Sequence, residues 1–297
     1  MYSDISSNKR RTWVLIAIMS VIVIGLSWFI GMLYGLDIES SIILGTMIAT
    51  IYSLISYYGS ASIALSVSGA KPIVKAQAPD LYNVVENLCI ANGQKTPEIY
   101  IIDDASPNAF ATGRDPEHAS IAFTTGILAL LTREELEGVA AHELSHVKNY
   151  DIRVMTIVVV LVGLISLIAD ILIHVRIGKN DNKGGNIGLI LMIVGIVLAI
   201  LSPLFAQLIQ LAISRSREYL ADASGALLTR YPEGLASALT KIEAHGVPMK
   251  NANHATAHLF LSNPFGAKKE SRSWFANMFS THPPMHDRIT RLRNMGR

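Results

Sequence analysis

Cysteine and charge are both scarce in this sequence. Cys89 is the single cysteine among 297 residues, so neither an internal disulfide nor a cysteine-based zinc site can form, and the scarcity suits a reducing compartment. Asp, Glu, Lys and Arg make up only 16% of the chain, and the net charge is +2. Basic residues form no run away from the apolar segments, which argues against a nucleic-acid partner. Internal repeats and low-complexity tracts are also absent.

Half of the chain is hydrophobic, and the apolar residues gather in long runs. No charge occurs between Arg11 and Asp37, and the run from Trp13 to Tyr34 is long enough to cross a bilayer, which takes about 20 residues. A second uncharged run lies between Glu39 and Lys71. Because a second span follows at once, we expect two membrane anchors and not a cleaved leader.

Two further apolar runs follow, from Val154 to Ile173 and over residues 187–213. Asp170 and His174 interrupt the far end of the first, and we expect Asp170 at the membrane interface. Pro203 in the other run is compatible with a kinked membrane helix. The sequence therefore predicts about four transmembrane helices, although the last two could also form a hairpin that does not fully cross.

Basic residues flank these runs and predict the orientation of the chain. Most of them lie on one side of the predicted spans: Lys9, Arg10, Arg11, Lys71, Lys75, Arg153, Arg215 and Arg217. The positive-inside rule then puts the N-terminus and both polar regions in the cytoplasm. A loop with Arg176, Lys179 and Lys183 lies on the predicted outer side and opposes this assignment. We expect a multi-pass protein of the cell membrane with its site facing the cytoplasm.

An H-E-x-x-H motif lies in the first polar region, at His142, Glu143 and His146. Thr132 and Glu135 form a capping-box pattern, which predicts that a helix begins here. Residues four apart share one face of a helix, about 5–6 Å from each other, so both imidazoles can bind one metal ion. A hydrolytic zinc site has three protein ligands and an open position for water, so the motif supplies two ligands and a base. The alternative is a pair of surface histidines on an amphipathic helix.

A candidate third ligand follows the fourth apolar run. Glu218 and Asp222 are four apart in a helical pattern, so they share a face. Such an acidic pair is usually solvated, but two apolar segments separate it from His146, which returns both regions to the same side of the membrane. We expect Glu218 to complete a site for one Zn²⁺ per chain, with Asp222 orienting a ligand histidine.

The remaining polar sequence predicts a small sheet and several helices. Glu98–Ile102 and Ser120–Thr124 have the pattern of strands. The stretch 107–113 between them is either a loop or an edge strand. As an edge strand beside the metal helix, its residues Asn108, Ala109, Phe110 and Ala111 could pair with an extended peptide substrate. Helices are predicted over 79–91, 232–245 and the C-terminal segment, with an irregular stretch over 251–280.

Other histidines are spare candidates for the site, at positions 254, 258, 282 and 286. His254 and His258 are four apart but lack the following glutamate, so we expect them on the surface.

These motifs together resemble the HtpX family of membrane-integrated zinc metalloproteases, and more distantly the CAAX prenyl proteases. The resemblance covers most of the chain and rests on the two N-terminal spans, the stretches 142–149 and 214–222, and the terminal Thr281-His282-Pro283-Pro284 with Arg288. It implies that His142, His146 and Glu218 bind zinc and that Glu143 is the catalytic base. It also implies degradation of misfolded membrane proteins during stress and supports substrate contact around 108–111.

The resemblance implies a mainly α membrane protein with a cytoplasmic α+β, zincin-like protease domain. We expect an N-terminal transmembrane hairpin (1–70), a first protease part (71–153), a second hydrophobic hairpin (154–213) and a second protease part (214–297). Glu143 would take a proton from the attacking water and pass it to the leaving amine. His282 and Arg288 are candidates for oxyanion or substrate contacts.

Two other functions stay open at this level. One is a processing protease that cuts a single defined membrane or lipidated substrate. The other is a non-catalytic membrane scaffold or transporter, in which Pro203, Asp170 and His174 would belong to a transport path. Polypeptide substrates and the bilayer are the partners we expect, and the sequence does not indicate an oligomeric state.

Overall fold

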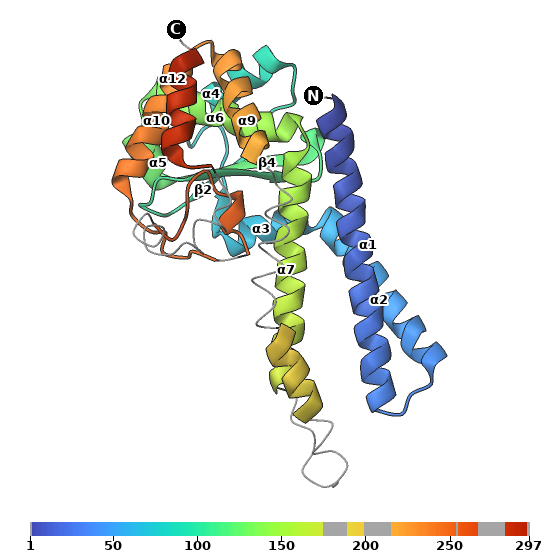
Figure 1. Cartoon of the computed structure of the whole chain (residues 1–297). Helices are drawn as coiled ribbons and strands as arrows, with labels where there is room; N and C mark the ends of the chain where they lie inside the picture. The colour runs from blue at the N-terminus through green and yellow to red at the C-terminus, as the bar shows by residue number, and fades with distance from the viewer. Residues whose placement is uncertain (1, 175–188, 199–214, 254, 267–282, 296–297) are drawn as a thin grey trace.

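The computed structural model describes residues 2–174, 189–198, 215–253, 255–266 and 283–295. It consists of a head, in which helices cover a small sheet, and an extended part made of long helices (Figure 1). The N-terminus and the C-terminus both lie at the head (Figure 1). The chain is therefore a mainly helical membrane protein with a small mixed sheet, as the sequence predicts.

Three of the described helices are long and apolar enough to cross a membrane. They belong to α1 (Tyr2–Leu33), α2 (Ile38–Tyr58) and α7 (Asp151–His174). α7 stays continuous through Asp170 and His174, whose exposed side chains form an i,i+4 pair with 3.1 Å between Oδ1 and Nδ1. The fourth predicted span is described only over the apolar helix Leu189–Leu198, and its remainder, with Pro203, lies outside the described residues.

The sheet has four strands in the order β1-β2-β4-β3. Its strands are β1 (Ala70–Pro72), β2 (Glu98–Ile102), β3 (Ala109–Gly113) and β4 (Ala119–Thr124). β2 and β4 are parallel, whereas β1 and β3 pair antiparallel with their neighbours. Both predicted strands are confirmed, and the open choice for 107–113 resolves to an edge strand.

Helices surround the sheet on both faces. α3 (Ser60–Val67) lies on the side of the extended part, and most other helices of the head lie on the opposite side (Figure 1). These are α4 (Pro79–Asn92), α6 (Arg133–Lys148), α9 (Arg215–Thr229), α10 (Pro232–His245) and α12 (Met285–Met295), with the short α5 (Thr125–Leu130) beside the sheet. Fully buried Ile121, Phe123, Leu144 and Leu235 belong to the core between the sheet and these helices.

α6 begins as the sequence predicts, because the capping box is complete. Thr132 Oγ1 accepts a hydrogen bond from the Glu135 backbone N–H, and Glu135 accepts one from the Thr132 N–H at 2.8 Å. The Glu135 carboxylate also accepts from Ser237 Oγ at 2.7 Å and Lys241 Nζ at 2.8 Å, both on α10. The residue that caps α6 therefore also fixes it to α10.

The prediction that His258 lies on the surface is wrong. The 3-10 turn η2 (Ala257–Leu259) folds against α7, where His258 is buried with its Nε2 2.8 Å from the Met155 carbonyl oxygen. The tertiary fold buries this loop, which local sequence could not indicate. His254 lies outside the described residues.

Two glycines allow the helices around α6 to approach its backbone closely. A Cβ atom added at Gly138 on α6 would lie 2.7 Å from the Leu235 backbone nitrogen of α10. One added at Gly225 on α9 would lie 3.0 Å from the His142 backbone nitrogen. Any larger residue at Gly138 would force the two helix backbones apart.

We expect Gly138→Ala to destabilise the head by about 1–3 kcal/mol, because the methyl group overpacks the contact with α10. The matched control is Gly163→Ala on α7, where an added Cβ meets nothing within 4 Å. Thermal unfolding of both variants in detergent measures the difference. An unchanged midpoint for Gly138→Ala would show that the two backbones separate without cost.

Candidate metal centre and active site

His142, His146 and Glu218 form one buried cluster. The two Nε2 atoms of His142 and His146 are 3.2 Å apart. Glu218 Oε1 lies 3.5 Å from His146 Nε2, and Glu218 Oε2 lies 3.8 Å from His142 Nε2. α6 contributes both histidines and α9 contributes the glutamate, so the fold joins residues separated by two apolar segments.

This donor set fits a divalent metal ion. Ligand atoms around tetrahedral zinc lie about 2.0–2.2 Å from the ion, so they are about 3.3–3.6 Å from one another. The separation of the two Nε2 atoms lies close to that range, and with one carboxylate oxygen of Glu218 included, all three ligand atoms lie within 4.8 Å of one another. Two neutral imidazoles and a carboxylate are also the donor types of hydrolytic zinc sites.

Each histidine has a carboxylate on its other ring nitrogen. Asp222 Oδ1 lies 3.0 Å from His142 Nδ1, and Asp151 Oδ2 lies 3.0 Å from His146 Nδ1. An acceptor at Nδ1 places the proton there and leaves Nε2 free to bind a metal. Both rings therefore present Nε2 to the same point.

Arg288 of α12 holds Asp222 in place. Its Nε donates to Asp222 Oδ2 at 2.9 Å and its Nη2 donates to Asp222 Oδ1 at 2.7 Å, with the guanidinium fully buried. Burial acts to raise the pKa of the Asp222 carboxyl, but the charge and hydrogen bonds of Arg288 outweigh it and lower the pKa to about 2. The same contacts commit two guanidinium nitrogens to Asp222, which favours a positioning role for Arg288 over a substrate contact.

Sequence reasoning missed Asp151. This residue is only five positions after His146, a spacing that faces away on a continuous helix. The chain turns between them, because Asn149 caps α6 and Tyr150 has a left-handed φ of 59° before α7 begins. The available signal was an acidic residue just beyond the end of the metal helix.

Glu143 is buried beside the cluster, with 3% of its surface exposed. Burial raises the pKa of its carboxyl, and the neighbouring charges of His142, His146 and Arg288 act in the opposite direction. A cation bound at the cluster would lower this pKa further. A carboxyl whose pKa is raised by burial is a stronger base than a solvated carboxylate, which suits a group that accepts a proton.

The edge strand β3 is partly paired with the chain itself. The Thr124 backbone N–H donates to the Asn108 carbonyl. Because backbone hydrogen bonds alternate along an antiparallel pair, the N–H and C=O groups of Ala109, Ala111 and Gly113 point away from β4. Leu261 N–H donates to the Ala109 carbonyl at 2.9 Å, and the Asn108 side chain exchanges two hydrogen bonds with the Ser262 backbone. Contact of Asn108–Ala111 with substrate stays a prediction. This part of the strand is already hydrogen-bonded to Leu261 and Ser262.

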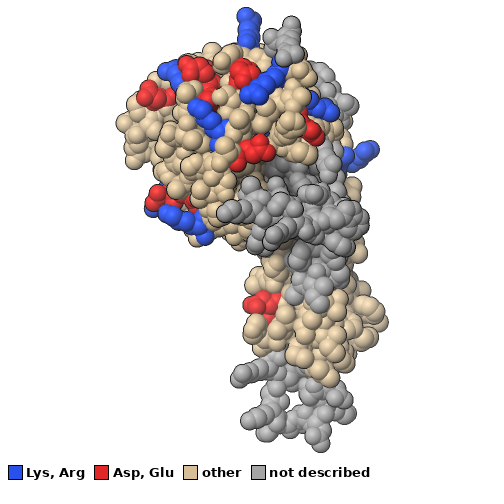
Figure 2. All heavy atoms as spheres, turned by 60° about the vertical axis from the view of Figure 1, so that its left-hand side comes forward, with Lys and Arg blue, Asp and Glu red and all other residues tan. Residues whose placement is uncertain are grey.

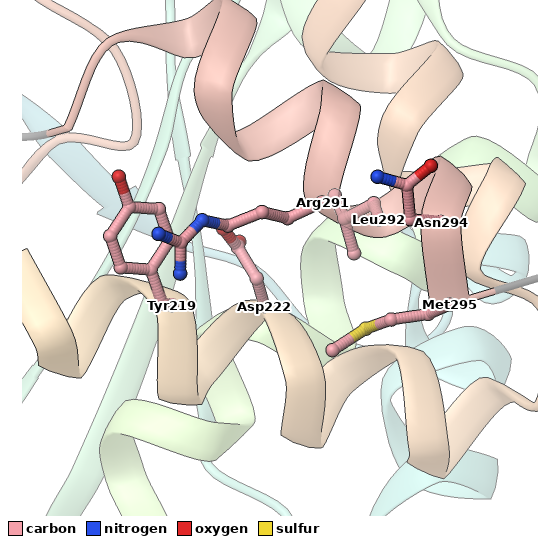
Figure 3. A pocket seen from close by; sticks show the side chains of 6 residues that line it. All are labelled: Tyr219, Asp222, Arg291, Leu292, Asn294 and Met295. Carbon is pink, nitrogen blue, oxygen red and sulfur yellow. The ribbon is translucent and has the colours of Figure 1, made fainter.

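The structure describes only one of the two predicted histidines 282 and 286. His282 lies outside the described residues, and His286 is exposed on α12. A cavity of ≈ 280 Å³ opens between α9 and α12, and Asp222 forms part of its wall (Figure 3). There the Arg291 guanidinium lies over the Tyr219 ring, with Cζ 3.8 Å from the ring centroid.

Comparisons with known proteins show which family the chain resembles. The model of peptidase family M48 matches residues 75–296. Protease HtpX homolog of Tropheryma whipplei (strain Twist) is 45% identical over 296 residues, which cover 100% of this chain and 99% of that protein. Protease HtpX homolog of Dictyoglomus thermophilum is 46% identical over 301 residues, covering 99% and 95%. The crystal structure of S. mikatae Ste24p has the same fold with a TM-score of 0.50 at 20% identity, and the match covers 98% of this chain and 66% of that one.

We expect Asp222→Asn to weaken Zn²⁺ binding about 10- to 100-fold, because His142 loses the charged acceptor that orients its ring. Chelator competition on the purified protein measures this affinity. Asp103→Asn, on an exposed side chain away from the cluster, is the control. Equal affinity in both variants would mean that Asp222 does not orient His142.

Proposed function

Because the chain belongs to peptidase family M48 and is a membrane protease, we propose that it is a zinc-dependent endopeptidase with one Zn²⁺ per chain. His142, His146 and Glu218 are the proposed ligands and Glu143 the catalytic base. The observation that carries this proposal is the buried His-His-Glu cluster, whose three ligand atoms converge while both remaining imidazole nitrogens contact carboxylates.

The residues of the chain have separate tasks in peptide hydrolysis. Zinc, when bound, supplies Lewis acidity toward a water molecule and the peptide carbonyl. Glu143 takes a proton from the attacking water and delivers it to the nitrogen of the leaving amine. Asp222 and Asp151 keep the two imidazoles oriented, and Arg288 keeps Asp222 ionised. His282 remains the candidate for an oxyanion contact.

We propose that substrates are polypeptides that lie extended along β3. β3 is one of the two edge strands of the sheet and lies directly against α6, the helix that carries the H-E-x-x-H motif. Edge strands bind extended peptides through backbone hydrogen bonds. β3 is buried, with the Ala109 carbonyl bonded to Leu261 and the Gly113 N–H bonded to Thr156 of α7, so a substrate would have to displace these contacts to pair with the strand.

We place the protein in the cell membrane as a multi-pass protein with its active site on the cytoplasmic side. The start of α1 and the start of α7 both lie at the head (Figure 1), where Lys9, Arg10 and Arg11 are found. Charged side chains gather on the head, and the extended part carries few on the face shown in Figure 2. By the positive-inside rule the head is cytoplasmic. This proposal includes the division into two transmembrane hairpins (1–70 and 154–213) and two protease parts (71–153 and 214–297).

Misfolded or damaged membrane proteins are the proposed substrates, cut in stress and quality control. The site supports this class because Asp151, the first residue of the span α7, contacts a proposed ligand. The proposed metal site is therefore close enough to the membrane surface to act on peptide bonds there. Cleavage of many unrelated unfolded membrane proteins favours quality control, and cleavage of one defined substrate favours a processing protease. Family membership argues against a scaffold or transporter.

Metal content is the first test. We expect about one zinc per chain in detergent-purified protein by elemental analysis, and clearly less in Glu218→Ala, because two histidines alone hold zinc weakly. Glu243→Ala, an exposed glutamate on α10, is the control. If neither wild type nor control holds zinc after reloading, the zinc protease proposal fails.

Glu143→Gln separates catalysis from metal binding. We expect the variant to keep its zinc and to lose at least about 100-fold in cleavage rate of an unfolded membrane protein, because the amide cannot accept the proton. Glu137→Gln, on the outer part of the same helix, should cleave at the wild-type rate. Comparable activity in the two variants would refute the role of Glu143.

A further inference from the structure

Asn8 is a buried polar residue near the start of the first membrane helix. Only 1% of its surface is exposed, whereas its neighbours Lys9 and Arg10 are exposed. Burial of an amide costs free energy unless its donors and acceptors are paired. The partners of Asn8 therefore explain why it lies inside the head.

Those partners come from two distant parts of the chain. Asn8 Nδ2 donates to the Asn149 carbonyl at 2.9 Å and to Asp151 Oδ1 at 2.7 Å. Arg217 Nη1 of α9 donates to Asn8 Oδ1 at 2.8 Å and to Asp151 Oδ1 at 3.0 Å. Asn8, Asp151 and Arg217 thus form a closed triangle of buried hydrogen bonds.

The two carboxylate oxygens of Asp151 have different partners. Oδ1 accepts from Asn8 and Arg217, and Oδ2 faces His146 Nδ1 at 3.0 Å. With one oxygen held by two donors, the carboxylate cannot rotate freely, so the other oxygen keeps its place against the imidazole. Arg217 is also the residue before Glu218, so the triangle lies next to two members of the cluster.

We propose that Asn8 is a positioning residue of the metal site, which makes the start of α1 part of the catalytic machinery as well as a membrane anchor. It acts through Asp151 on the orientation of His146. The proposal rests on the ligand assignment made above. Its specific content is that loss of the Asn8 amide alters the metal site even when α1 stays docked.

The test compares Asn8→Leu, a substitution of similar size without hydrogen bonds, with Thr12→Val in the same helix. Thr12 is also buried, but among the described residues its hydroxyl donates to the Asn8 carbonyl within α1 and not to the triangle's side chains. We expect Asn8→Leu and Asp151→Asn each to weaken Zn²⁺ binding about 10- to 100-fold, and Thr12→Val to leave it unchanged. The visible spectrum of the Co²⁺-loaded protein should change in Asn8→Leu and not in Thr12→Val.

A double variant separates positioning from simple docking of α1. If Asn8 acts through Asp151, Asn8→Leu combined with Asp151→Asn binds Zn²⁺ no more weakly than Asp151→Asn alone. Additive losses, or a wild-type spectrum and affinity in Asn8→Leu, would overturn the proposal. If Asn8→Leu does not fold, Asn8→Ser, whose hydroxyl is too short to reach Asp151, replaces it. Absence of zinc from the wild type would instead refute the proposed function.

Discussion

The orientation of two imidazoles is the constraint on which the rest of the head depends. A histidine on a helix can rotate about two bonds, and a metal ion accepts its nitrogen only within a narrow range of directions. Here each ring is held by a carboxylate from outside its helix, Asp222 on α9 and Asp151 at the start of α7. Those carboxylates are held in turn, by Arg288 of the C-terminal helix and by Asn8 and Arg217. Both ends of the chain therefore meet at one site.

Close helix packing makes these contacts possible. α9 approaches the backbone of α6 at Gly225, next to His142, and this approach brings Glu218 and Asp222 within reach of the histidines. On another side of α6, Gly138 and the Glu135 carboxylate fix α10. Small residues and paired charges thus set the separations in the cluster, while the apolar core sets only the general arrangement.

The sequence predicted local features and the cluster itself, but not the contacts that depend on an irregular turn or on a distant helix. The capping box at Thr132, the strands at 98–102 and 120–124 and the helix at 232–245 follow from short-range patterns, and all are present. The convergence of Glu218 with the histidines could also be inferred, because two apolar segments return the chain to the same side. Asp151 was missed since its contact depends on the left-handed turn at Tyr150, and His258 was misassigned because a distant helix buries it. Neither event leaves a periodic pattern in the sequence.

The pairing of Leu261 and Ser262 with Ala109 and Asn108 has a consequence for substrate choice. A peptide that used this part of β3 would exchange an existing set of hydrogen bonds for an equivalent set, so backbone pairing alone would supply little net free energy. The free energy of peptide binding would then depend on side-chain contacts and on how readily the peptide becomes extended. A segment inside a folded neighbour would also lose its own hydrogen bonds, whereas an unfolded chain would not. If substrates bind along β3 as proposed, an edge that is already paired would favour unfolded over folded polypeptides by thermodynamics, without reading any particular sequence.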